Sequence, residues 1–112
     1  MIKNILKQKF DLRKVPKNST SNFDTFIFFV RNKKEKIGVL RIINKNNFGT
    51  KNLPDAIQWH CSFFWDHIFN KVDIKKFKKT KELLNHSIAI PILLNKKLSD
   101  YEVLSKDIAN IR

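Results

Sequence analysis

The sequence contains little cysteine or glycine and no long apolar run. Cys61 is the only cysteine among 112 residues, so an internal disulfide framework is impossible and a cysteine-rich zinc site is excluded. Gly38 and Gly49 are the only glycines, which excludes a glycine-rich phosphate-binding loop. The longest apolar run, Ile88–Leu94, is much shorter than the ~18 residues that span a bilayer. We therefore expect no cofactor and no membrane span.

Acidic residues are also scarce. Lys and Arg number 23 against 10 Asp and Glu, and the formal net charge is +13. The hydrophobic fraction of 42% is typical of a folded protein, and the length is that of one domain. Because this charge is self-repelling on a small domain, a polyanion is the expected partner. Nucleic acid is the first candidate, and an anionic membrane surface is the second.

Four residue types, Lys, Asn, Ile and Phe, make up about half of the chain, with 19, 12, 14 and 10 residues. Codons rich in A and T encode them, whereas Gly, Ala and Pro, which need G and C, are rare. We therefore expect a very AT-rich coding genome, such as that of an organelle or a reduced bacterium. The bias accounts for part of the lysine content. It does not account for the net positive sign, because Asp and Glu were equally available.

Aromatic and β-branched residues predict three strands. Phe23–Val30 is the clearest, and Ile57–Trp65 is the second. Leu83–Leu94 contains the third, centred on residues 87–90, and Pro91 confines the end of that strand to an edge or an exit.

Helical spacing predicts a helix at the C-terminal end. Ser99–Glu102 has the pattern of a capping box. The helix that follows has one apolar stripe, formed by Tyr101, Leu104, Ile108 and Ile111.

The first 22 residues are predicted as an N-terminal arm or linker. Apolar residues at helical spacing over 2–13 favour a short helix or an ordered arm, and turn-forming residues over 14–22 favour a linker. Residues 23–112 are then predicted as a single α+β domain.

Residues 33–46 remain open between strand and helix. The run from Ile37 to Ile43 is rich in β-branched residues, which would extend residues 23–43 into a hairpin. Ile37, Leu40 and Ile43 also share one helical face, and Asn32 could cap a helix.

Clustered lysines give the strongest signal of a site. Six lie between residues 71 and 81 with only Asp73 opposing them, as phosphate-backbone binding requires. Aromatic residues surround them and could stack on bases or form part of the core. The lysines are Lys71, Lys75, Lys76, Lys78, Lys79 and Lys81, and the aromatic residues are Trp59, Phe63, Phe64, Trp65, Phe69 and Phe77.

Catalytic patterns are weak by comparison. Asp55, Asp73 and Lys75 match the minimal set of a Mg²⁺-dependent nuclease, but the match is short and lysine is common throughout the chain. The possible metal ligands, His60, Cys61, Asp66, His67 and His86, lack a ligand pair at helical spacing. We expect no metal site and no enzyme.

The centre of the chain resembles the family of small-subunit ribosomal protein S-ten. Leu53-Pro54 with Ile57, an aromatic segment to Trp65, and His67-Ile68-Phe69 before Lys71 carry the resemblance, as does the basic stretch through Phe77 to Thr80. Departures are Trp65-Asp66 for the family's Ser-Pro, Val72-Asp73-Ile74 for its Ser-Arg-Glu, and the lack of a counterpart for residues 1–22.

The resemblance implies a fold and a function. It implies a ferredoxin-like βαββα sheet, with residues 33–46 as its first helix, and a long basic β-extension over about residues 63–80. It also implies a non-catalytic protein of an organellar small ribosomal subunit, mitochondrial and organelle-encoded, with no small-molecule substrate and no membrane partner. Neighbouring ribosomal proteins and rRNA would be its partners. The six clustered lysines would bind rRNA and His67 would shape the turn into the extension, while Trp65, Phe69 and Phe77 would contact protein or bases.

Two alternatives remain open from sequence. One is a small basic nucleic-acid-binding protein of an AT-rich microbe or phage, which a hairpin over residues 23–43 would favour. The other is the Mg²⁺-dependent nuclease.

Overall fold

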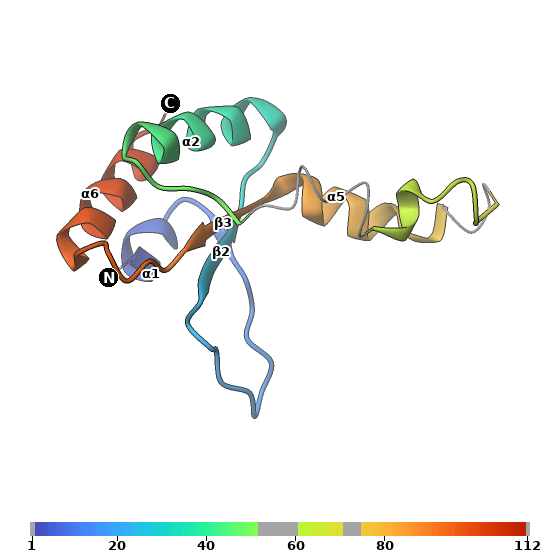
Figure 1. Ribbon diagram of the computed structural model, residues 1–112, viewed down its shortest axis with the longest axis horizontal. Coiled ribbons are helices and arrows are strands. Elements are labelled where there is room, and N and C mark those ends of the chain that lie inside the picture. The colour runs from blue at the N-terminus through green and yellow to red at the C-terminus, as the bar shows by residue number, and fades with distance from the viewer. Residues whose placement is uncertain (1, 52–60, 71–74, 112) are drawn as a thin grey trace.

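The computed structural model describes residues 2–51, 61–70 and 75–111. Within these ranges the fold combines four α-helices with a three-stranded antiparallel sheet, so the predicted α+β class is confirmed. The elements in chain order are α1 (Ile2–Leu6), β1 (Asp11–Leu12), β2 (Thr25–Phe29), α2 (Lys33–Lys45), the 3-10 helix η1 (Ser62–Phe64), α5 (Lys78–His86), β3 (Ser87–Pro91) and α6 (Leu98–Ala109) (Figure 1).

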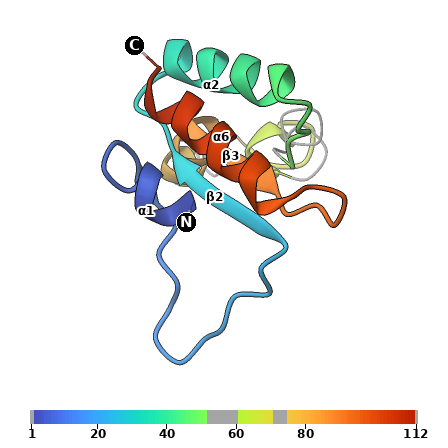
Figure 2. The same cartoon turned by 90° about the vertical axis from the view of Figure 1, so that its left-hand side faces the viewer.

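The sheet has the order β1-β2-β3, with β2 in the centre. Phe28 pairs with Ile88 and Phe26 pairs with Ile90, so these four side chains share one face of the sheet. Helices α1, α2 and α6 lie on the same side of the sheet (Figures 1 and 2). The predicted first and third strands are confirmed, and Pro91 does end a strand at the sheet edge.

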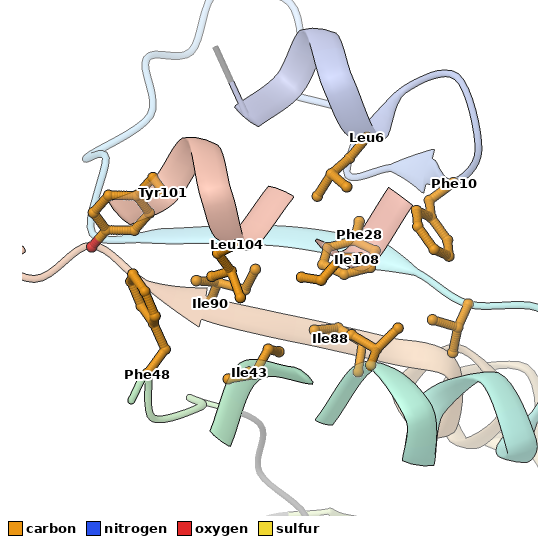
Figure 3. Packing of buried hydrophobic residues seen from close by; sticks show 12 residues of the cluster. Leu6, Phe10, Phe28, Ile43, Phe48, Ile88, Ile90, Tyr101, Leu104 and Ile108 are labelled. Atoms are coloured by element: carbon orange, nitrogen blue, oxygen red, sulfur yellow. The ribbon is translucent and has the colours of Figure 1, made fainter. Parts of the chain in front are cut away.

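One hydrophobic core joins the strands to the three helices (Figure 3). Phe28 and Ile88 from the sheet are fully buried against apolar side chains of α2 and α6. The buried members of the cluster are Leu6, Phe10, Phe28, Val30, Val39, Ile43, Phe48, Ile88, Ile90, Tyr101, Leu104 and Ile108.

The segment left open over residues 33–46 is a helix. Asn32 begins it as the N-cap, because its side-chain oxygen accepts a hydrogen bond from the backbone N–H of Glu35. The Glu35 carboxylate in turn accepts from the backbone N–H and guanidinium of Arg31, at 2.7 and 2.8 Å. Val39 and Ile43 then face the core. Capping and one buried face therefore outweigh the β propensity of this segment.

Helix α6 begins earlier than the sequence pattern indicated. The predicted capping box at Ser99–Glu102 is wrong, because the N-cap is Lys97, whose backbone N–H donates to Asp100 Oδ2 at 2.8 Å. The predicted stripe is confirmed for Tyr101, Leu104 and Ile108, which are buried, and Ile111 is partly buried. The Tyr101 hydroxyl accepts from the Leu93 N–H and donates to the Pro91 carbonyl, which fixes the exit from β3.

The N-terminal residues contribute to the same body. The short helix predicted within residues 2–13 is confirmed as α1, and β1 pairs with β2. Leu6 and Phe10 are buried in the core cluster. Lys9 donates from Nζ to the carbonyls of Ala109 and Ile111 at the end of α6. The division of the chain at residue 22 stays a prediction, but residues 2–12 are held by the domain that follows.

The second predicted strand is not found where the structure describes its residues. Positions 57–60 lie outside the described residues, and Ser62–Phe64 forms a 3-10 helix. A strand would send Phe63 and Phe64 to opposite faces. The tight turn instead places the centroids of the two rings 4.9 Å apart.

Residues 61–70 and 75–86 project from the body, and we call these two described segments the basic extension. It projects along the long axis of a molecule that measures 48 × 35 × 27 Å (Figure 1). The predicted β-extension over residues 63–80 is wrong in this described part, where we find a 3-10 helix, a turn at 66–68 and α5. Phe77, Lys81 and Leu84 follow one another at helical spacing, and Phe77 and Lys81 contact the rings of Phe69 and Phe64.

Truncating Leu6 tests whether α1 stabilises the body. Leu6→Ala removes a fully buried side chain and is expected to lower the free energy of unfolding by about 2–4 kcal/mol. Urea denaturation measures the change, with Asn4→Ala, at an exposed position of α1, as the control. Equal stability of Leu6→Ala and the wild type would show that α1 is a loose arm.

The ion pair between Arg31 and Glu35 should make the free energy of unfolding depend on pH. Its hydrogen bonds hold the pKa of Glu35 below the ordinary value. Stability from this carboxylate is therefore present at neutral pH and is lost as the pH falls through the folded-state pKa. Glu35→Gln should cost about 1 kcal/mol at pH 7 and little near pH 3.

Denaturation of wild type and Glu35→Gln across this pH range gives the test. Glu102→Gln is the control, because Glu102 makes an exposed pair with Lys106 and should cost less at pH 7. If the loss of stability caused by Glu35→Gln did not change with pH, the Glu35 carboxylate would not be the stabilising group.

Candidate nucleic-acid interface

Among the described residues, hydrogen bonds from Val30 and Lys36 attach the basic extension to the body. The backbone N–H of Val30 donates to the His86 carbonyl at 2.9 Å. Lys36 of α2 donates from Nζ to the carbonyls of Asn85 and Leu84, at 2.7 and 3.4 Å. These carbonyls belong to the last turn of α5, where a cation interacts favourably with the negative end of the helix dipole. Lys36 is half-buried, and this burial lowers its pKa.

Aromatic side chains pack together within the extension. Trp65 stacks on Phe69 with ring centroids 6.3 Å apart, and Phe69 meets Phe77 edge-on, also at 6.3 Å. The ring of Phe63 is buried. Lys81 places Nζ 4.9 Å from the centroid of Phe64 and so makes a cation–π contact. The extension therefore has a small apolar cluster of its own, apart from the main core.

Three lysines of the set, Lys75, Lys78 and Lys79, are exposed on the extension. Lys75 and Lys79 are exposed, before and after Phe77, the N-cap of α5. Lys78 is exposed beside them, with Nζ 4.0 Å from the carboxylate of Glu82. Neighbouring cations at one-turn spacing match the point-charge contacts that a phosphate backbone accepts. Lysine suits such contacts and is poor at bidentate reading of bases.

The structure brings together only part of the predicted site. The five described lysines of the set, Lys75, Lys76, Lys78, Lys79 and Lys81, are all exposed, and Lys81 lies over the rings of Phe63 and Phe64. Trp65, Phe69 and Phe77 are half-buried and contact one another, so their rings are largely occupied within the cluster. His67 is exposed in the turn at 66–68. Lys71 lies outside the described residues.

The described residues do not form the predicted nuclease site or a metal site. Asp55, Asp73 and His60 lie outside the described residues, so the nuclease set stays a prediction. Over residues 2–51, 61–70 and 75–111, no three His, Cys, Asp or Glu side chains are placed to hold a metal ion. No helix in those same ranges is long and apolar enough to cross a bilayer.

Sequence reasoning missed the role of Lys36. Its contact with α5 joins residues 48 and 49 positions apart. Nothing in the local sequence distinguishes it from Lys33 and Lys34, which are exposed in the same helical turn.

Comparisons with known proteins found no relative of this chain. No protein-family model matches the sequence, and no curated protein or solved structure matches it. The interpretation of the interface therefore depends on its own geometry.

Replacing Lys36 tests the attachment of the extension. Lys36→Met keeps the apolar stem and removes the donor to the last turn of α5. Amide exchange in that turn should accelerate by about tenfold, the loss expected for a charge-assisted hydrogen bond. Exchange in β2 should change little. Lys33→Met is the matched control, and equal acceleration in α5 and β2 would point to global destabilisation instead.

Proposed function

We propose that this protein is a non-catalytic structural component of an organellar, mitochondrial-type small ribosomal subunit. In this proposal the exposed lysines of the basic extension bind rRNA, and neighbouring ribosomal proteins cover other surfaces. One observation carries the proposal. Lys75, Lys78 and Lys79 are exposed on a helical extension that projects away from the core.

The charge of the whole chain supports a polyanionic partner. A formal net charge of +13 on 112 residues is balanced most effectively by counter-charge from outside the protein. Lysine–phosphate contacts position a protein on nucleic acid without reading sequence. The expected role is therefore positioning within an assembly.

The order of elements supports the ribosomal form of the proposal. Strand β2 is followed by α2, as the resemblance to the S-ten family requires, and the hairpin of the alternative nucleic-acid-binding hypothesis is not formed. We propose further that the body is a ferredoxin-like variant. Its antiparallel central pair is β2 and β3, each followed by a helix on the same face. The N-terminal β1 lies beside β2, where that fold places its last strand.

Salt dependence tests the interface. RNA binding should weaken steeply with salt, by about 0.7–0.9 in log K per log salt for each phosphate contacted. The double variant Lys75→Gln/Lys79→Gln should reduce this slope by about 1.4–1.8. Fluorescence anisotropy of a labelled structured RNA measures both quantities.

The control for this test has the same loss of charge elsewhere. Lys14→Gln/Lys17→Gln changes two exposed lysines in the loop between β1 and β2 and should leave the slope nearly unchanged. Association insensitive to salt, or equal slopes for the two double variants, would contradict the interface. Separately, failure of the protein to cosediment with small ribosomal subunits would contradict the ribosomal role.

A further inference from the structure

A groove opens on the body away from the basic extension. It has a volume of about 510 Å³, which is within the range of ligand-binding sites. Its walls come from α1, the loop between β1 and β2, the start of β2, and the chain from the end of β3 to the first residue of α6. Figure 2 shows this loop as the long arc next to α1 and β2.

Apolar side chains line the groove and remain open to solvent. Phe23 is 73% exposed, Leu98 is 72% exposed and Val15 is 55% exposed. Ile92, also in the lining, is 42% exposed. Such grouping on one surface of a small protein is typical of an interaction site.

The loop holds Phe23 in this exposed position. Its φ of 55° lies in the left-handed region, which is unfavourable for a bulky residue. The Phe23 N–H donates to Ser21 Oγ at 3.2 Å. The next residue, Asp24, accepts from Lys51 Nζ at 2.5 Å. Local contacts thus stabilise a turn that directs an aromatic ring outward, and strained turns of this kind gather at functional sites.

The charge around the groove selects among possible occupants. Lys3 and Arg13 are exposed in its lining, and the lining residues that the structure describes include no carboxylate. A second copy of the chain, with a net charge of +13, would be repelled. A flat membrane surface would contact the protruding side chains of Phe23 and Leu98 but would leave the volume of the groove unfilled. RNA would use the cations and leave the apolar lining unsatisfied.

We propose that this groove binds a short amphipathic segment of a partner protein, whose apolar side chains enter the groove and whose Asp or Glu side chains pair with Arg13 and Lys3. Apolar anchors in a groove with charged residues along its edge are a recurrent mode of peptide recognition. The site is separate from the basic extension and does not depend on the proposed function.

Synthetic peptides test the proposal on the full-length protein. One is an amphipathic peptide with leucines on one face, flanked by glutamates. A second carries glutamine in place of the glutamates, and a third carries glutamine in place of the leucines. Fluorescence anisotropy should show about tenfold tighter binding of the first peptide than of either other. Failure of the first peptide to bind would overturn the proposal.

Matched variants locate the binding surface. Arg13→Glu and Leu98→Ser should each weaken binding about tenfold. Their controls are Lys34→Glu on α2 and Val103→Ser on α6, two exposed positions outside the lining, which should change binding less than twofold. Equal losses in a variant and its control would show general charge attraction or nonspecific apolar contact.

Two competition experiments address the other occupants. Anionic vesicles or structured RNA should not displace the peptide. Displacement by vesicles that Leu98→Ser abolishes would assign the groove to a membrane. Displacement by RNA that Arg13→Glu abolishes would assign it to RNA. Either result would overturn the proposal.

Discussion

The structure depends on how a chain with a net charge of +13 uses its cations. Several lysines serve the fold itself by donating to carbonyls at helix C-termini, where the helix dipole favours positive charge. Lys9 reaches the end of α6, Lys36 reaches the end of α5, and Lys96 lies 3.4 Å from the carbonyl of Asn46, the C-cap of α2. Each contact links segments distant in sequence, so part of the positive charge joins the helices into one body. Only the lysines that remain outside these contacts are available to a partner.

The basic extension is a preformed structure with its own packing. Contacts among the rings of Trp65, Phe69 and Phe77 hold it together, and Lys36 attaches it to α2. A flexible tail would lose conformational entropy when it bound a polyanion, whereas an ordered helix loses less. Lys75, Lys78 and Lys79 are exposed on this ordered segment. The same aromatic residues that could have stacked on bases are therefore used to order the surface that presents the charge.

The sequence predicted the elements whose signals are local. The strand around Phe28, the strand around Ile88 and the stripe of α6 all follow from periodicity within a few residues. Periodicity could not place Lys97 as the N-cap of α6, because lysine is not a preferred capping residue. It could not decide residues 33–46, where β propensity competed with a cap at Asn32. The strand predicted through Trp65 was wrong over residues 62–64, because consecutive aromatic residues fit a strand and a tight turn equally well. The β-extension over residues 63–80 was expected from the family resemblance alone, and the helix α5 replaces part of it. The attachment by Lys36 had no local signal at all.

Strand β3 connects the two surfaces that are proposed to face partners. Its first residue, Ser87, follows the last turn of α5, and its last residue, Pro91, precedes Ile92 in the wall of the apolar groove. Five extended residues span about 17 Å, so the basic extension and the groove lie at opposite ends of one largely buried strand, each residue of which pairs with β2. Such a strand is a rigid spacer. A polyanion on the extension and an acidic protein segment in the groove would both lower the self-repulsion of the chain. The two surfaces can thus be occupied together without competing for charge or for space, as a small protein that joins nucleic acid to a neighbouring protein requires.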